Sequence, residues 1–258
     1  MEALAVVIVV LLGLIFGSFL NVCIARLPGH ESIVRPRSRC PHCKSPIAAF
    51  DNIPVLSYVL LRGRCRACHK PIAWRYPAVE IVLTLLWLLC WFSFGPTLRA
   101  LGMAVLTFLL LGLAVMDAET MRLPDAFTLP GIVLGIFYSG AICDHWARCA
   151  VLSIGWGASF AGILLAISGI YWLLRHQAGM GIGDAKLIAM IAAWLGPSPS
   201  VVVLVFGTIL AAIYGLYISA IRRRLDIPIP FGSFLCLAAI YAVFYGQQTV
   251  YWYLGFFR

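Results

Sequence analysis

Long apolar runs without a charged side chain alternate with short polar segments along almost the whole chain. A helix needs about 20 mostly apolar residues to cross the hydrocarbon core of a bilayer. The run over 187–221 is interrupted by two prolines in Gly196-Pro197-Ser198-Pro199-Ser200, so we divide it there. Eight runs result: 3–25, 81–98, 100–116, 126–143, 149–174, 187–195, 201–221 and one that starts near Phe231. The pattern predicts an all-α polytopic membrane protein with about eight transmembrane helices.

Composition excludes the soluble alternatives. Of the 258 residues, 62% are hydrophobic and 11% are charged. A soluble globular domain carries about 25% charged residues, so this chain lacks the polar side chains needed to cover a water-exposed surface. The same composition excludes disordered, collagen-like and small disulfide-rich proteins.

The basic residues predict the direction of the spans. No basic residue precedes the first run, and Arg26 follows it, which is the reverse of a cleaved signal peptide. We therefore expect residues 1–25 to form an uncleaved helix with its amino terminus outside. Segment 26–78 then lies in the cytoplasm with ten of the 19 basic residues. Six more fall on the same side: Arg122, Arg175, Lys186 and Arg222–Arg224. We expect Arg99, Arg148 and Arg258 outside.

Most of the net charge is also concentrated in segment 26–78, which has ten basic residues against Glu31 and Asp51, or +8 of the total +9. Such a segment attracts anionic lipids. Nucleic-acid binding is the alternative, but membrane spans flank the segment on both sides. We therefore expect contact with membrane lipids and no nucleic-acid partner.

Four of the nine cysteines form two C-x2-C pairs with 21 residues between them. They are Cys40, Cys43, Cys65 and Cys68. Paired knuckles of this kind are typical of a zinc site with four thiolate ligands, which closes a small domain that has no large core. The cytosol is reducing, so disulfides are not expected there. We predict a structural zinc ion, because four ligands leave no position for a substrate.

Cys143 and Cys149 flank a short outer loop and could form a disulfide in an oxidising compartment. The sequence leaves that pairing open.

Asp117 and Asp184 are ionisable residues at the edges of apolar runs, where they are costly and therefore suggest function. Asp117 ends the third run, and Asp184 opens the sixth. The predicted topology puts both at the cytoplasmic face, where they could meet although 67 positions separate them. Gly179, Gly181 and Gly183 precede Asp184, and glycine permits positive φ or close approach of a peptide substrate. We predict a catalytic aspartate pair beside a loop that supports the substrate.

Such a pair can hydrolyse an amide, because one member activates water while the other protonates the leaving group. Asp184 begins a helix and Asp117 ends one, so the helix dipoles favour an anion at Asp184. We therefore expect Asp117 to carry the shared proton.

These motifs resemble those of the bacterial type IV prepilin peptidases, and the likeness covers nearly the whole chain. The matching stretches are Gly17-Ser18-Phe19-Leu20-Asn21-Val22, the four cysteines, Asp51 to Tyr58, Arg75-Tyr76-Pro77 with Glu80, Asp117 through Asp125, Gly181 to Leu187, and Pro230-Phe231-Gly232. Ser233 stands where a second proline is expected.

The resemblance implies a bifunctional enzyme of the bacterial inner membrane. It would cleave the leader of type IV prepilins or pseudopilins, which serve pili and type II secretion, after a glycine. Asp117 and Asp184 would be its proteolytic aspartates. It would then methylate the new amino terminus with S-adenosylmethionine, although no glycine-rich nucleotide loop identifies the residues that bind this methyl donor.

The resulting domain prediction has a first transmembrane helix (1–25), a cytoplasmic zinc domain (26–78) and a transmembrane aspartic peptidase domain (79–258). Two other functions stay open. An ion-coupled transporter would use the aspartates as a proton relay, and a membrane-anchored zinc-ribbon binding module would need neither aspartate.

Overall fold

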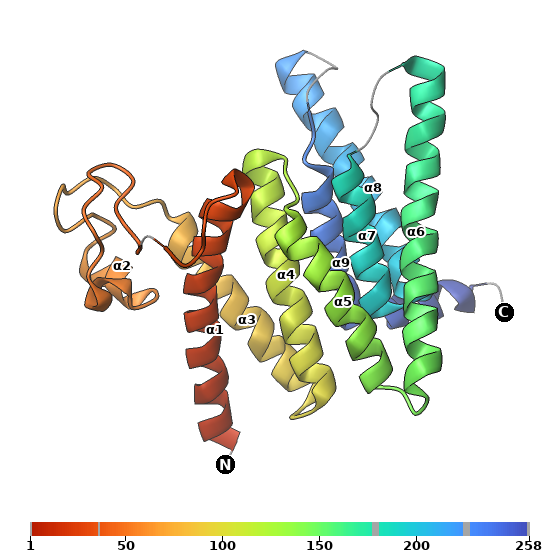
Figure 1. Cartoon of the computed structure of the whole chain (residues 1–258), viewed down its shortest axis with the longest axis horizontal. Coiled ribbons are helices and arrows are strands. Elements are labelled where there is room, and N and C mark those ends of the chain that lie inside the picture. The colour runs from red at the N-terminus through yellow and green to blue at the C-terminus, as the bar shows by residue number, and fades with distance from the viewer. Residues whose placement is uncertain (1, 36, 177–180, 224–227, 257–258) are drawn as a thin grey trace. The chain divides into compact units, whose positions relative to one another are not determined.

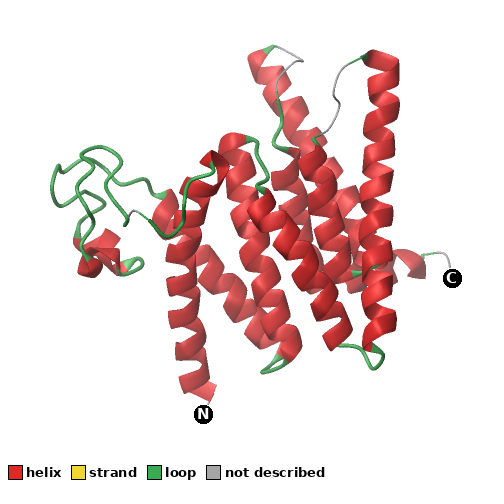
Figure 2. Cartoon of the chain, in the orientation of Figure 1, coloured by secondary structure: helices red, strands yellow, loops and turns green. Residues whose placement is uncertain are grey.

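The computed structural model describes residues 2–35, 37–176, 181–223 and 228–256, and within these ranges the regular structure is helical apart from two isolated β-bridges (Figure 2). Gly179 of the glycine loop and Arg224 and Arg258 of the charge pattern lie outside the described residues. Contacts divide the chain into two compact units, Met1–Gly112 and Leu113–Arg258, with the division inside α4 (Leu98–Thr120).

In the first unit, α1 (Glu2–Arg26) packs along α3 (Arg75–Phe94) (Figure 1). Their close approach depends on Gly17, because a Cβ there would lie 2.7 Å from the Cα of Glu80. The chain between the two helices has only short helical pieces and loops. These pieces are η1 (Leu27–Gly29), η2 (Ala49–Asn52) and α2 (Leu56–Leu60). A long loop-rich segment with so small a core needs another source of stability, such as a metal.

The second unit is built around α7 (Ile182–Leu195), which packs against four other helices. These are α5 (Asp125–Ala141), α6 (Trp146–Arg175), α8 (Pro197–Arg222) and α9 (Phe231–Gly255) (Figure 1). The part of α7 from 187 to 194 is buried throughout, as expected of a helix that is apolar on every face. Trp194 fixes its end by donating a hydrogen bond of 2.8 Å to the carbonyl oxygen of Gly131 in α5.

Each predicted span coincides with a helix, but the helices differ in length. Within the described ranges, six are long and apolar enough to cross a membrane: α1, α3, α4, α6, α8 and α9. These six make the chain a multi-pass membrane protein. α5 has 17 residues and α7 has 14, which is short for a hydrocarbon core of about 30 Å. The total of eight spans therefore stays a prediction.

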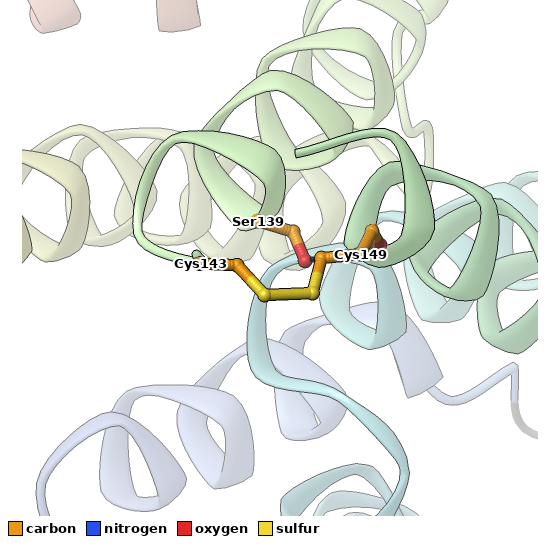
Figure 3. Close-up of a disulfide and its surroundings, with 3 residues drawn as sticks. All are labelled: Ser139, Cys143 and Cys149. Atoms are coloured by element: carbon orange, nitrogen blue, oxygen red, sulfur yellow. Dashed lines mark hydrogen bonds between the residues drawn. A yellow bond between two sulfur atoms is a disulfide. The ribbon is translucent and has the colours of Figure 1, made fainter. Parts of the chain in front are cut away.

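A disulfide joins Cys143, in the loop between α5 and α6, to Cys149 in the first turn of α6 (Figure 3). Ser139 donates a hydrogen bond of 3.5 Å to the carbonyl oxygen of Cys149 beside it. The sequence left this pairing open, and the structure contains the disulfide.

Candidate functional site

Two groups of predicted functional residues assemble in the structure, one in each unit. In the first unit, the four cysteine Sγ atoms lie within 4.8 Å of one another. Cys40 and Cys68 are 3.8 Å apart, and Cys43 and Cys65 are 4.0 Å apart. Four sulfur atoms at about 2.3 Å from a tetrahedral zinc ion are separated by about 3.8 Å, so the cluster fits one metal ion.

The two cysteine knuckles share one backbone conformation. The N–H of Cys40 donates to the carbonyl of Ser45, and the N–H of Cys65 donates to that of Lys70 in the same way. The residue that follows each second cysteine has positive φ, 61° at Lys44 and 56° at His69. Such repeated turns hold each pair of thiols on one side of its loop.

A bidentate ion pair connects the stretch between the knuckles to the second knuckle. Arg66 donates through Nε and Nη2 to the two carboxylate oxygens of Asp51, at 2.7 and 2.6 Å. These hydrogen bonds and the charge of the guanidinium lower the pKa of the Asp51 carboxyl. Arg66 therefore has a partner within the segment, beside the thiol cluster.

In the second unit, Asp117 occupies the last turn of α4 and is 5% exposed. Its Oδ2 accepts a hydrogen bond of 2.7 Å from the backbone N–H of Ser233 and lies 3.0 Å from the Ser233 hydroxyl. Ser233 belongs to the first turn of α9, so a carboxylate from one helix caps the start of another. Gly232 leaves room for it, because a Cβ there would lie 3.1 Å from the same oxygen.

Asp184 lies in the first turn of α7, after Gly181 at the N-cap position. The charges of Asp117 and Asp184 are close enough to interact. Leu123 supports this arrangement, since its side chain lies 3.2 Å from the Cβ position of Gly183 and 2.9 Å from that of Gly232. The interaction of the two charges and the contacts of Leu123 place the ends of α4, α7 and α9 that carry Asp117, Asp184 and Gly232 near one another.

A salt bridge connects the same two motifs. Lys186 in α7 lies 2.7 Å from a carboxylate oxygen of Asp125, the first residue of α5. It fixes the start of α7 beside the loop that follows Asp117.

The glycines before Asp184 act differently from the sequence expectation of positive φ. Gly181 has a φ of −75°, an ordinary extended value. Gly183 is a helical residue packed against Leu123, where the absence of a side chain permits close contact within the chain. Gly183 is therefore needed for a close contact, as expected, but the group that contacts it is Leu123 of the same chain and not a substrate backbone.

Sequence reasoning did not assign a role to Ser233, Gly232 or Leu123. Gly232 belongs to the motif Pro230-Phe231-Gly232, which was the available signal that the start of α9 matters.

Comparison with known proteins agrees with these two groups. Residues 11–94 match the family described as the bacterial peptidase A24 N-terminal domain, and residues 103–216 match the type IV leader peptidase family. A prepilin leader peptidase/N-methyltransferase of Aeromonas hydrophila is 36% identical over 96% of this chain and 93% of its own length. The chain belongs to the type IV leader peptidase family.

Two more relatives extend this comparison. Proteins with the same description from Legionella pneumophila and Pseudomonas putida are each 35% identical to the chain. They cover 96% and 92% of it, over 94% and 89% of their own lengths. No solved structure matches the chain. As a member of this family the protein is an enzyme.

Proposed function

We propose that this enzyme is an aspartic endopeptidase of the bacterial inner membrane that cleaves the leader of type IV prepilins or pseudopilins after a glycine. It then methylates the new amino terminus with S-adenosylmethionine. The observation that carries the proposal is the meeting of Asp117 and Asp184, whose charges interact although 67 positions separate them in the sequence.

The chemistry needs both carboxyl groups. One ionised carboxylate takes a proton from water, whose oxygen attacks the carbonyl carbon of the leader's final glycine. The other carboxyl gives its proton to the amide nitrogen as the C–N bond breaks. Gly181 and Gly183 flank Ile182 just before Asp184 and would support the substrate backbone there.

The four-cysteine cluster would hold a structural zinc ion through Cys40, Cys43, Cys65 and Cys68. Bound there, zinc would cross-link the two knuckles, because four sulfur ligands complete its usual shell. The two knuckles and the Asp51–Arg66 pair would together give segment 26–78 a defined shape. The boundaries 1–25, 26–78 and 79–258 belong to this proposal.

The orientation also belongs to the proposal: amino terminus outside, with the zinc domain and the active site at the cytoplasmic face. It rests on the basic residues of segment 26–78.

The test uses the purified full chain in detergent with a peptide that carries a short basic leader, a glycine and an apolar helix. Mass spectrometry of the products should identify a cut after the glycine. With S-adenosylmethionine present, the new amino terminus should gain one methyl group. An intact peptide, or a cut at another bond, would contradict the proposal and favour the transporter or the zinc-ribbon module.

Gly232→Ala should reduce cleavage at least about tenfold, because small displacements of catalytic groups have large effects on rate. The new Cβ would lie 3.1 Å from Oδ2 of Asp117 and 2.9 Å from Leu123 Cδ1, so the carboxylate has to move. The measurement is kcat/KM for the same peptide. Gly162→Ala is the matched control, since nothing lies within 4 Å of its Cβ position. Equal kcat/KM values for the two variants would show that cleavage does not depend on the space that Gly232 leaves for Asp117.

A further inference from the structure

Ser233 connects the start of α9 to Asp117 through two of its groups. The backbone N–H donates to Oδ2 of Asp117 at 2.7 Å. The hydroxyl lies 3.0 Å from the same oxygen and 2.8 Å from the carbonyl oxygen of Ala114, one turn earlier in α4. Ser233 and Asp117 are both buried, so water competes little for these hydrogen bonds.

These contacts constrain where a proton can sit on Asp117. A backbone N–H can only donate, so Oδ2 is its acceptor. The hydroxyl has a single proton, which it gives either to Oδ2 or to the Ala114 carbonyl. In both cases the N–H favours an unprotonated Oδ2, and hydrogen bonds to the ionised form of a carboxyl stabilise that form.

The start of α9 adds a favourable electrostatic contribution. Ser233 is the third residue of this helix, whose N-cap residue, Pro230, makes no side-chain capping hydrogen bond. Asp117 takes the place of that cap, at the positive end of the α9 dipole. The sequence expectation compared Asp184 at the start of its helix with Asp117 at the end of α4, and it did not include α9. The structure places a second helix end against it with the opposite effect.

Among the residues that the structure describes, Asp184 has fewer hydrogen-bond donors than Asp117. Its carboxyl receives a hydrogen bond from the backbone of Gly181, within its own turn. It also faces the charge of Asp117. When two carboxyls share one proton, the anion resides on the member with the better donors.

We propose that Ser233 is a positioning residue that keeps Asp117 ionised, so that Asp184 carries the shared proton. The inference rests on the proposed function of the two aspartates and reverses the sequence expectation. Asp117 takes the proton of the attacking water on Oδ1, the oxygen to which Ser233 does not donate. Asp184 gives its own proton to the leaving nitrogen. The pair ends with its proton on Asp117, and the starting state returns when that proton passes to Asp184.

Within the part of the chain that the structure describes, two titratable groups whose charges interact with that of Asp117 have to be considered in a pH experiment. One is Asp184 in α7, and the other is the Cys236 thiol, one turn after Ser233 in α9. Cys236 is completely buried, so we treat it as a neutral thiol in the pH experiment. The two limbs of a pH profile are therefore assigned to the aspartate pair.

The experiment measures kcat/KM for cleavage of the prepilin-like peptide against pH, with the full chain and three variants. Ser233→Ala removes the hydroxyl and keeps the N–H. Ser233→Pro removes both donors, and proline is tolerated in the first turn of a helix. Ser153→Ala is the control, because this buried serine donates to the backbone carbonyl of Ala193, at the opposite end of α7 from Asp184.

The acidic limb should move to higher pH by about one unit in Ser233→Ala, and further in Ser233→Pro. Below that limb, a shift of one unit lowers kcat/KM about tenfold. The basic limb should stay in place, and Ser153→Ala should leave both limbs unchanged.

Movement of the basic limb alone would mean that Asp117 carries the proton, and the inference would be wrong. Limbs that stay in place in both Ser233 variants would also overturn the inference. If kcat/KM is lower in those variants while the limbs stay in place, Ser233 has a purely structural role. Asp117→Asn separates this inference from the proposed function, since retained cleavage there contradicts the aspartate pair itself.

Discussion

Cleavage of a prepilin-like peptide should fall by about 10²–10⁴-fold in Asp117→Asn and by a similar factor in Asp184→Asn, because each change removes one partner of a general acid–base pair. An amide side chain has nearly the same shape as a carboxyl but can neither take a proton from water nor give one to the leaving nitrogen. In Asp117→Asn the amide oxygen can still accept the Ser233 N–H, so the start of α9 should stay capped. The measurement is kcat/KM with purified protein.

Asp144→Asn is the matched control, since Asp144 is an exposed residue in the loop between α5 and α6. It should cleave at the unmodified rate. The three variants should also have the same thermal stability within a few degrees. Wild-type cleavage by either of the first two variants would leave the aspartate pair without support.

Cys40→Ser and Cys68→Ser should each release the metal and disorder segment 26–78. The stability of a small loop-rich domain comes largely from such a site, and one lost ligand opens its shell. Metal analysis should give about one zinc per chain for the unmodified protein and much less for either variant. Limited proteolysis should then cut within 26–78, and methylation of the cleaved peptide should be lost.

His42→Ala is the control for this second prediction. His42 lies inside the first knuckle but does not belong to the group whose ligand atoms converge. Its removal should leave the zinc content unchanged. Full zinc content in both serine variants would contradict the four-cysteine site.

The sequence predicted the helices well because the bilayer sets their length. A run such as 3–25 must be apolar to cross lipid, and α1 covers Glu2–Arg26. The cysteine cluster was also predictable, since each knuckle is a local turn whose spacing places two thiols together. Counting spans led us to expect Asp117 and Asp184 at one face, and the interaction of their charges agrees with a position near each other.

Contacts between distant helix ends could not be predicted in this way. Asp117 and Ser233 are 116 positions apart, and nothing in either local sequence specifies that one caps the helix of the other. The expected protonation of Asp117 relied on the helices that contain the two aspartates, α4 and α7, and therefore omitted the donors of α9. The role of Gly183 likewise depends on Leu123, whose position comes from packing.

The central claim is that Asp117 and Asp184 act on one amide together, and kcat/KM of the double variant Asp117→Asn/Asp184→Asn tests it most directly. Groups that act as a unit have strongly non-additive effects. If the two carboxyls act together, we expect kcat/KM of the double variant to lie within about threefold of that of the slower single variant. Losses that multiply, so that the double variant falls by the product of the two single effects, would show that the two carboxyls work independently.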